Sequence, residues 1–498
     1  MGKCLCLFMF LAIVIAPGHA QVNDGQQTLD ETEQNSTTSA APGDAASQTD
    51  GNALTLGLDA APGDPPAGTP SFLLGGLFVS ESAQTEPNLA GQPSVYSVPR
   101  VLAKVDLLKL WHRSVTAFNY IGGGIFYPSG AQQIQQFTAS QRFLMGRRQL
   151  TLSDSYGYFY GGSFGASSLG GGGLSNLISP AGAGGPVSPG LPIFSGATNF
   201  GGIGTGPSLT NVGQAVFADA LTRRSSVVLA SFYGITSYKS NGEGLISSRQ
   251  FSGVVAYNYQ LSPRSAVSVL YGYRAFRYPY SATTSIADNL VHLSYQRRLS
   301  NRMRIALGVG PETTSLTTRM QIIRTPPTFL TVNTNQVNAS VSGSLGYSWG
   351  RIQSAFSYQR LTTGGSGVSA GANSDIAQGS ATRRVFGAWE GSLDSGYARL
   401  RQIGSVSSTA AASYHYWYAG AAVRRNLPNN LGFFASYQYN KENSNNSLCA
   451  VNHVCGSGRN IFLVGLSWRA RPIRLDHGGE DVGTDTSDTS AADQSGHQ

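Results

Sequence analysis

The chain has 498 residues, of which 41% are hydrophobic, 10% aromatic and only 12% charged, and its formal net charge is +8. The charge is segregated: residues 21–70 hold eight acidic residues, residues 476–498 hold six, and neither segment contains Lys or Arg. Apart from Lys3, all basic residues lie in the middle, which therefore has 33 basic and 12 acidic residues, a net charge near +21. Beyond the first twenty residues no apolar run is long enough for a membrane helix, so a membrane-spanning mature chain would have to be a β-barrel.

The two ends of the chain predict targeting and disorder rather than folded structure. Residues 1–20 have one basic residue, Lys3, then an apolar run to Ala16 and a small-residue cleavage region, the pattern of a secretory signal peptide. The run is short for a spanning helix, so a retained membrane helix is the less favoured interpretation. Residues 21–70 and 476–498 have few large apolar side chains and are predicted to be disordered acidic tails.

Between the tails, residues 71–475 alternate repeatedly between apolar and polar side chains. The clearest run is Val337 to Trp349, where apolar or aromatic residues occupy one parity and Ser, Asn and Gly occupy the other. Successive side chains of a strand point to opposite faces, so this pattern predicts a strand with one apolar face. Sandwich strands usually have about five or six residues, and these runs are longer. Other clear runs are residues 251–261, 267–273, 291–295, 303–309, 431–439 and 462–468.

Short connections that contain Arg alternate with longer polar connections along the chain. The longer ones include residues 239–247, 313–333, 364–375 and 441–458. Short turns at one end and long loops at the other are typical of an outer-membrane barrel. Counting from an opening strand at 71–81 to a closing strand at 460–468 predicts about 18 strands, an even number. A propeller or a sandwich is less favoured, because each repeat offers two long strands rather than a four-stranded blade.

Residues 161–207 form a Gly-rich stretch without charged side chains, which we predict to be one very long loop. Within it, Gly161 to Gly165 match the pattern of a nucleophile elbow around Ser163. That motif requires a strand, a sharp turn and a helix, whereas Gly-rich loop follows here. We therefore assign no catalytic residue and do not expect an enzyme.

Cysteine and histidine usage predicts a disulfide and no metal site. Cys4 and Cys6 lie in the signal peptide, so the mature chain keeps Cys449 and Cys455, close together in a polar segment of an exported protein. A disulfide that closes this loop is the simplest interpretation. Zinc usually needs four ligands, and only His453 is nearby. No cofactor is expected.

Taken together, the signal peptide, long alternating strands, aromatic residues near strand ends and asymmetric connections resemble a Gram-negative outer-membrane β-barrel of the porin-like kind over residues 71–475. Gly465, Leu466 and Trp468 of the closing strand are similar to the terminal signal by which such barrels are recognised for assembly. The chain departs from that pattern by continuing for thirty residues past Trp468, which favours a family other than the trimeric porins.

The resemblance implies a single all-β, transmembrane, antiparallel up-and-down barrel in the outer membrane, with both termini in the periplasm. It also implies outer-membrane lipids and the barrel-assembly machinery as partners. We expect small anionic or neutral solutes as further partners, leave a homo-oligomer open and expect no nucleic acid.

Arginines in the short turns are the strongest functional signal. In a closed barrel they would ring the periplasmic mouth: Arg113, Arg147, Arg148, Arg223, Arg224, Arg264, Arg297, Arg298, Arg302, Arg351, Arg383, Arg384, Arg424 and Arg425. They would bind lipid phosphates and anchor the rim, or concentrate anions at the mouth of a pore. The acidic tails would also fit this ring as a salt-sensitive gate. Arg274 and Arg304 are candidates for the lumen.

Aromatic side chains allow two interpretations, a girdle at the membrane interfaces or a track that binds sugars. The girdle is favoured, because barrels place Tyr and Trp at both membrane surfaces. The residues concerned are Tyr414, Tyr416, Trp417, Tyr418, Tyr437, Tyr439 and Trp468.

The sequence predicts an outer-membrane, porin-like channel for passive diffusion of small hydrophilic solutes, with a preference for anions. A barrel this wide leaves an aqueous lumen unless something fills it, and residues 161–207 are the candidate filler. The alternative is a non-conducting structural or surface-binding, adhesin-like barrel that acts through its long extracellular loops.

Overall fold

The computed structural model describes residues 71–87, 93–128, 130–159, 208–238, 246–279, 284–324, 327–364, 370–385, 389–403, 413–444 and 458–475. The predicted signal peptide, both acidic tails, the Gly-rich stretch 161–207 and the two mature cysteines lie outside these residues. Within the described ranges, no helix combines the length and apolar character needed to cross a membrane.

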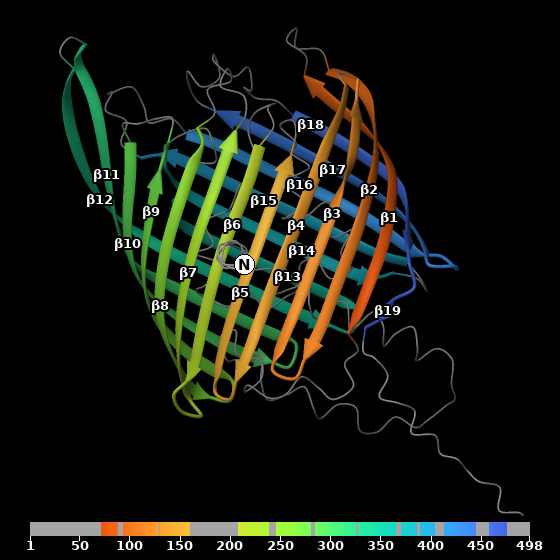
Figure 1. Cartoon of the computed structure of the whole chain (residues 1–498), viewed down its shortest axis with the longest axis horizontal. Coiled ribbons are helices and arrows are strands. Elements are labelled where there is room, and N and C mark those ends of the chain that lie inside the picture. The colour runs from red at the N-terminus through yellow and green to blue at the C-terminus, as the bar shows by residue number, and fades with distance from the viewer. Residues whose placement is uncertain are drawn as a thin grey trace, which may run out of the picture.

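Eighteen long antiparallel strands close into one up-and-down barrel (Figure 1). Each strand pairs with its neighbours in sequence, and β1 pairs with β18 as well as β2, so the sheet has no open side. The fold class and the strand count predicted from the sequence are confirmed. The strands are β1 Phe72–Pro87, β2 Pro93–Trp111, β3 Ser114–Tyr127, β4 Gly130–Met145, β5 Arg148–Phe159, β6 Ser208–Ala220, β7 Ser225–Tyr238, β8 Ser248–Ser262, β9 Ser265–Arg277, β10 Thr284–Ser300, β11 Met303–Arg324, β12 Pro327–Trp349, β13 Ile352–Thr363, β14 Ala372–Arg384, β15 Trp389–Gln402, β16 Ser413–Asn426, β17 Leu431–Ser444, β18 Gly458–Arg469 and the two-residue β19 Ile473–Arg474, which pairs with β1.

The outer surface carries the large apolar side chains that alternation assigned to one face. In β9, Val269, Tyr271 and Tyr273 are exposed, whereas Leu270 and Phe276 are buried. Exposed and buried side chains alternate in the same way along β8, β10 and β18. In a closed barrel one parity faces outward and the other faces the lumen, so the exposed apolar side chains form the outside. These predicted strand faces are confirmed.

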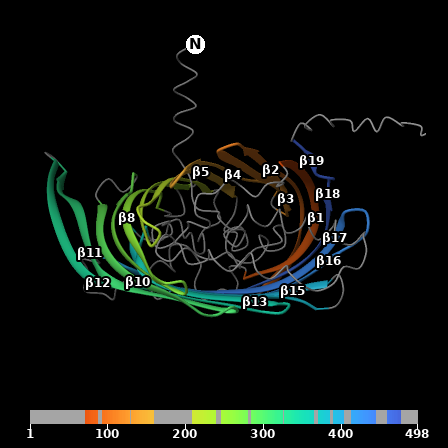
Figure 2. The ribbon, with the colours of Figure 1, turned by 90° about the horizontal axis from the view of Figure 1, so that it is seen from below.

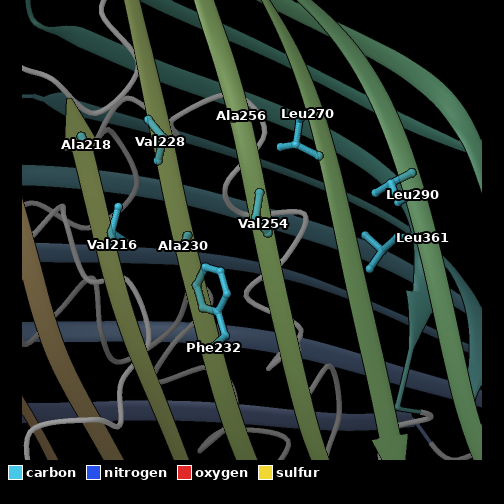
Figure 3. Close-up of a cluster of buried hydrophobic side chains, with 10 residues drawn as sticks. All are labelled: Val216, Ala218, Val228, Ala230, Phe232, Val254, Ala256, Leu270, Leu290 and Leu361. Atoms are coloured by element: carbon cyan, nitrogen blue, oxygen red, sulfur yellow. The ribbon is translucent and has the colours of Figure 1, made fainter. Parts of the chain in front are cut away.

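The lumen face is less polar than the sequence predicted. Val254 and Ala256, for example, lie on the inward parity of β8 and are buried. They belong to a cluster that crosses the inner wall of neighbouring strands, and Leu361 of β13 lies beside Leu290 of β10 within it (Figure 3). The members are Val216, Ala218, Val228, Ala230, Phe232, Val254, Ala256, Leu270, Leu290 and Leu361.

The β11–β12 hairpin rises beyond its neighbours (Figures 1 and 2). These two strands stay paired to Arg324 and Pro327, whereas β12 pairs with β13 only as far as Val341 and Arg360. The prediction of a polar loop over residues 313–333 was therefore wrong. The segment is rich in Thr, a β-branched residue that favours strands, so polar composition was a poor guide to its conformation.

Gly308 in β11 has no side chain, which lets side chains of β10 and β12 contact each other across β11. The ring of His292 in β10 is hydrogen-bonded to Ser340 at 2.9 Å and to Ser342 at 3.0 Å, both in β12. Gly308 of β11 lies directly opposite Ser342, and a Cβ there would collide with Nε2 of His292. The absence of a side chain at Gly308 is therefore what allows the histidine to tie three strands together.

We expect Gly308→Ala to destabilise the barrel by about 1–3 kcal/mol, because a methyl group forced into a filled space displaces its neighbours. The measurement is urea-induced unfolding in lipid vesicles followed by tryptophan fluorescence. Gly346→Ala in β12 is the matched control, since a Cβ at Gly346 meets nothing within 4 Å. Equal stability of the two variants would contradict this packing.

Candidate functional site

The structure places all fourteen predicted rim arginines at one end of the barrel, in the short turns or the strand ends beside them. Backbone hydrogen bonds join successive turns around this end. Their acceptors are the carbonyl oxygens of Arg113, Arg147, Arg224, Arg264 and Arg302, each bonded to an amide of a strand in the following hairpin. These bonds connect the turns from β2–β3 round to β12, and we call the fourteen arginines at this end the basic rim.

Acidic residues neutralise only part of the basic rim. Arg148 forms an ion pair with Asp219 at 3.1 Å, and Arg424 forms one with Glu390 at 2.7 Å. The guanidinium of Arg425 lies 5.3 Å from the ring of Trp389, in a cation–π contact. The rim carries fourteen positive charges, and the two ion pairs described here offset two of them.

Strand parity divides the rim arginines between the two faces of the wall. In β10, Arg297 follows exposed Tyr295 on the outward parity, whereas Arg298 shares the inward parity of buried Ser294. Arg298 pairs across the strands with Arg304 of β11, which is also on the inward parity. The lumen beside the rim thus receives two adjacent cationic side chains, one of which is a predicted lumen residue.

The other predicted lumen residue, Arg274 of β9, lies in a buried charge cluster with Asp288 of β10 and Glu312 of β11. Its Nε and Nη2 donate to Oδ2 of Asp288 at 2.8 and 2.5 Å, and Nη2 also donates to Glu312. Thr314 Oγ1 donates to Oδ1 of Asp288 at 3.0 Å. One guanidinium bonded to two carboxylates makes strong, charge-assisted hydrogen bonds that fix all three side chains.

The charge cluster contacts the end of β13, where pairing with β12 has stopped but pairing with β14 continues. Residues 361–364, here called the inward turn, contact inward side chains of strands that lie several positions away in the sheet. The amide of Thr362 donates to Oε1 of Glu312 at 2.9 Å, and the hydroxyl of Tyr278 donates to the carbonyl of Gly364 at 3.3 Å. β9 is separated from β13 by three strands, so these hydrogen bonds join the inner faces of strands that are not neighbours in the sheet.

Three aromatic residues assigned to the girdle face the lumen instead. Tyr414, Tyr416 and Tyr418 of β16 are 5%, 3% and 6% exposed and form one buried cluster, whereas Trp417 between them is exposed. The girdle assignment is therefore wrong for these three, because a strand cannot present consecutive residues to one face. Exposed Tyr437 and Trp468 lie on the outside, together with Tyr439.

Sequence reasoning also missed two buried arginines on the lumen wall, Arg100 in β2 and Arg459 in β18. Both lie on the inward parity, and the alternation of β2 gave no signal for Arg100, since Pro99 and Val101 flank it. Several other predicted site residues, Ser163, Cys449, Cys455 and His453, lie outside the described residues. Among the described residues, no group of three or more His, Cys, Asp and Glu could hold a metal ion.

Comparison with known proteins finds similarity only to solved structures. No protein-family model matches the chain, and no curated protein matches it. The similar structures include three from Pseudomonas aeruginosa. OccK9 (OpdG) is 12% identical, with 80% of this chain and 98% of that chain covered and a TM-score of 0.39. OpdL is 10% identical, with 80% and 99% covered and a TM-score of 0.39.

OccK2 (OpdF), solved in complex with glucuronate, is 10% identical, with 81% and 98% covered and a TM-score of 0.38. At these identities and TM-scores, the similarity does not indicate the function of this chain. The porin-like architecture expected from the sequence rests on the closed barrel of this chain itself.

We expect Arg274→Met to destabilise the barrel by about 3–5 kcal/mol, because two buried carboxylates would lose their shared cation. Arg148→Met is the matched control: Arg148 is 61% exposed, and an exposed ion pair contributes less than about 1 kcal/mol. Unfolding in urea, read by tryptophan fluorescence, compares the two. A loss for Arg274→Met no larger than for Arg148→Met would show that the cluster does not hold this wall together.

Proposed function

We propose that the chain is an outer-membrane, porin-like channel through which small hydrophilic solutes diffuse passively. The observation that carries the proposal is a closed barrel of eighteen long strands with exposed apolar side chains outside and charged side chains on the lumen wall. Lipid admits only structures whose backbone groups are all paired, and barrels of this size leave an aqueous lumen. The predicted signal peptide supports export to the outer membrane.

The basic rim is proposed to face the periplasm. In outer-membrane barrels the short turns lie in the periplasm and the longer connections lie outside the cell. β1 begins at Phe72 and β18 ends at Arg469, and both residues lie at the end of the barrel where the short turns lie. We propose on this basis that both chain termini lie in the periplasm.

Positive charge at the rim supports a preference for anions. A mouth lined by one sign of charge and walled by low-dielectric protein raises the local concentration of counter-ions. Arg298 and Arg304 extend that charge from the rim into the lumen. Small anionic solutes would therefore enter more readily than cations, and neutral ones would pass without electrostatic help.

The decisive pair for this preference is Arg297 and Arg298, neighbours with opposite orientations. Reversal potentials of the protein in planar bilayers under a KCl gradient should show anion selectivity. We expect Arg298→Glu to reduce that selectivity strongly at low salt and weakly at high salt, because salt screens the charge. Arg297→Glu, which changes the same charge on the outer surface, should leave selectivity close to wild type. Equal effects of the two variants would refute lumen-based selectivity.

The inward turn is proposed to narrow the lumen and limit the size of the solute. It crosses from β13 to side chains of β9 and β11, and its anchors, Thr362 and Gly364, are hydrogen-bonded to Glu312 and Tyr278. A chain segment held inside the barrel by a buried charge cluster is a fixed obstacle to large solutes.

Glu312→Ala should release the inward turn and raise both the single-channel conductance and the current noise. The reason is that the amide of Thr362 loses its acceptor, while Arg274 and Asp288 remain as a balanced pair. The measurement is single-channel recording in planar bilayers, after heat-modifiable migration on gels has verified folding. Conductance and noise identical to those of wild type would show that the turn does not restrict the pore.

A further inference from the structure

A second basic site lies on the lumen wall away from the basic rim. Arg100 belongs to the half of β2 that begins at Pro93, whereas the rim turn follows Trp111 at the other end of the strand. Arg459 lies near the start of β18, which the closure of the barrel brings to the far side of β1. Arg100 and Arg459 are 6% and 7% exposed, and both lie on the inward parity.

Hydrogen bonds of the neighbouring side chains define the site. Nη2 of Arg459 donates to Oε1 of Gln84 at 2.6 Å and to the hydroxyl oxygen of Tyr96 at 2.9 Å. Arg100 is within electrostatic range of Arg459, Tyr96 and Tyr127. The rings of Tyr96 and Tyr127 are 6.4 Å apart, centroid to centroid. Two guanidinium groups and two phenols from three strands of the closed sheet thus converge on one part of the lumen wall.

Unlike Arg274, Arg100 has no counter-charge among the described side chains. Its Nε has no hydrogen-bond partner, and no carboxylate among the described side chains forms an ion pair with it. Arg274, equally buried, is bonded to two carboxylates. A buried charge without a partner costs free energy, so the site would gain most from an anion. The guanidinium fork fits a planar or tetrahedral oxyanion through two parallel hydrogen bonds.

We propose that Arg100, together with Arg459, Tyr96 and Tyr127, forms a binding subsite in the lumen for the oxyanion group of a small solute, a carboxylate or a phosphate. This subsite would add a specific solute contact to the proposed channel. It rests on the proposed function only because the solute must reach the lumen. The basic rim concentrates anions at one mouth, and this subsite holds the charged group of a permeating solute at a second, separate position.

The test uses the refolded mature chain in detergent micelles and measures nuclear magnetic resonance line broadening of labelled acetate and of inorganic phosphate. Wild type should broaden the signal of at least one of them in a saturable manner, and the comparison shows which oxyanion the subsite takes. Arg100→Met should weaken that binding by about tenfold or more, the loss expected for charge-assisted hydrogen bonds. Arg277→Met is the matched control: Arg277 is exposed on the outward parity at the end of β9, away from the basic rim, and the variant should bind as wild type does.

Stability separates a ligand-binding role from a structural one. If Arg100 serves an anion, Arg100→Met removes an unpaired buried charge, and the variant should resist urea at least as well as wild type. A structural arginine would instead make Arg100→Met less stable. Loss of stability with unchanged anion binding would overturn the proposal.

Saturable binding of neither anion by wild type would also overturn it, even if the protein conducts ions with anion preference. Binding that Arg100→Met abolishes, in a protein that shows no conductance, would retain the subsite and refute the channel. The two proposals therefore fail by different results.

Discussion

Closure of the sheet is the constraint on which the rest of the structure depends. A strand edge in a membrane leaves amide and carbonyl groups without partners, at a cost of several kcal/mol each, so only a closed barrel is stable there. Pairing of β1 with β18 meets this constraint, because it leaves each long strand with a partner on both sides. Closure also assigns the two parities of every strand to different solvents. One parity becomes a continuous apolar exterior, and the other becomes a confined lumen in which a few charges dominate.

The lumen uses arginine in three different electrostatic settings. At the rim, most guanidinium groups are exposed, and the fourteen arginines outnumber the described acidic partners Asp219 and Glu390, which creates a diffuse attraction for anions that salt screens. Arg274 is buried with two carboxylates, and these ion pairs hold the wall and the inward turn in place. Arg100 is buried without a described carboxylate, so its charge remains available to a ligand. Depending on its partners, arginine thus attracts anions to the mouth, stabilises the barrel wall or is available to bind a ligand.

Strand faces and strand number were predictable because alternation is a local property. Val337, Tyr347 and Trp349 share one parity in the sequence and are all exposed on the outside of β12. The same rule, applied strictly, would have placed Tyr414, Tyr416 and Tyr418 opposite Trp417. Aromatic composition alone groups them with Trp417, whereas parity separates them from it. The β11–β12 hairpin is hidden for a similar reason, since the polar side chains of residues 313–333 resemble those of a loop although the segment is mostly strand.

The candidate sites depended on information that alternation does not contain. Contact between Arg274, Asp288 and Glu312 requires the register between three strands. The contacts of the inward turn depend on where the pairing of β12 with β13 stops, which no local pattern indicates. Arg100 lies in a stretch where both parities carry apolar residues, so the sequence does not show which face is the lumen. The rim arginines, by contrast, lie in turns whose position follows from the strand count, and they were found.

The central claim is that this barrel encloses a continuous aqueous path. Single-channel recording of the refolded mature protein in a planar bilayer, with folding verified beforehand, tests it most directly. The structure predicts stable, reproducible current steps. Folded, membrane-inserted protein that gives no steps would contradict the claim and would assign the function of the barrel to its outer surface instead.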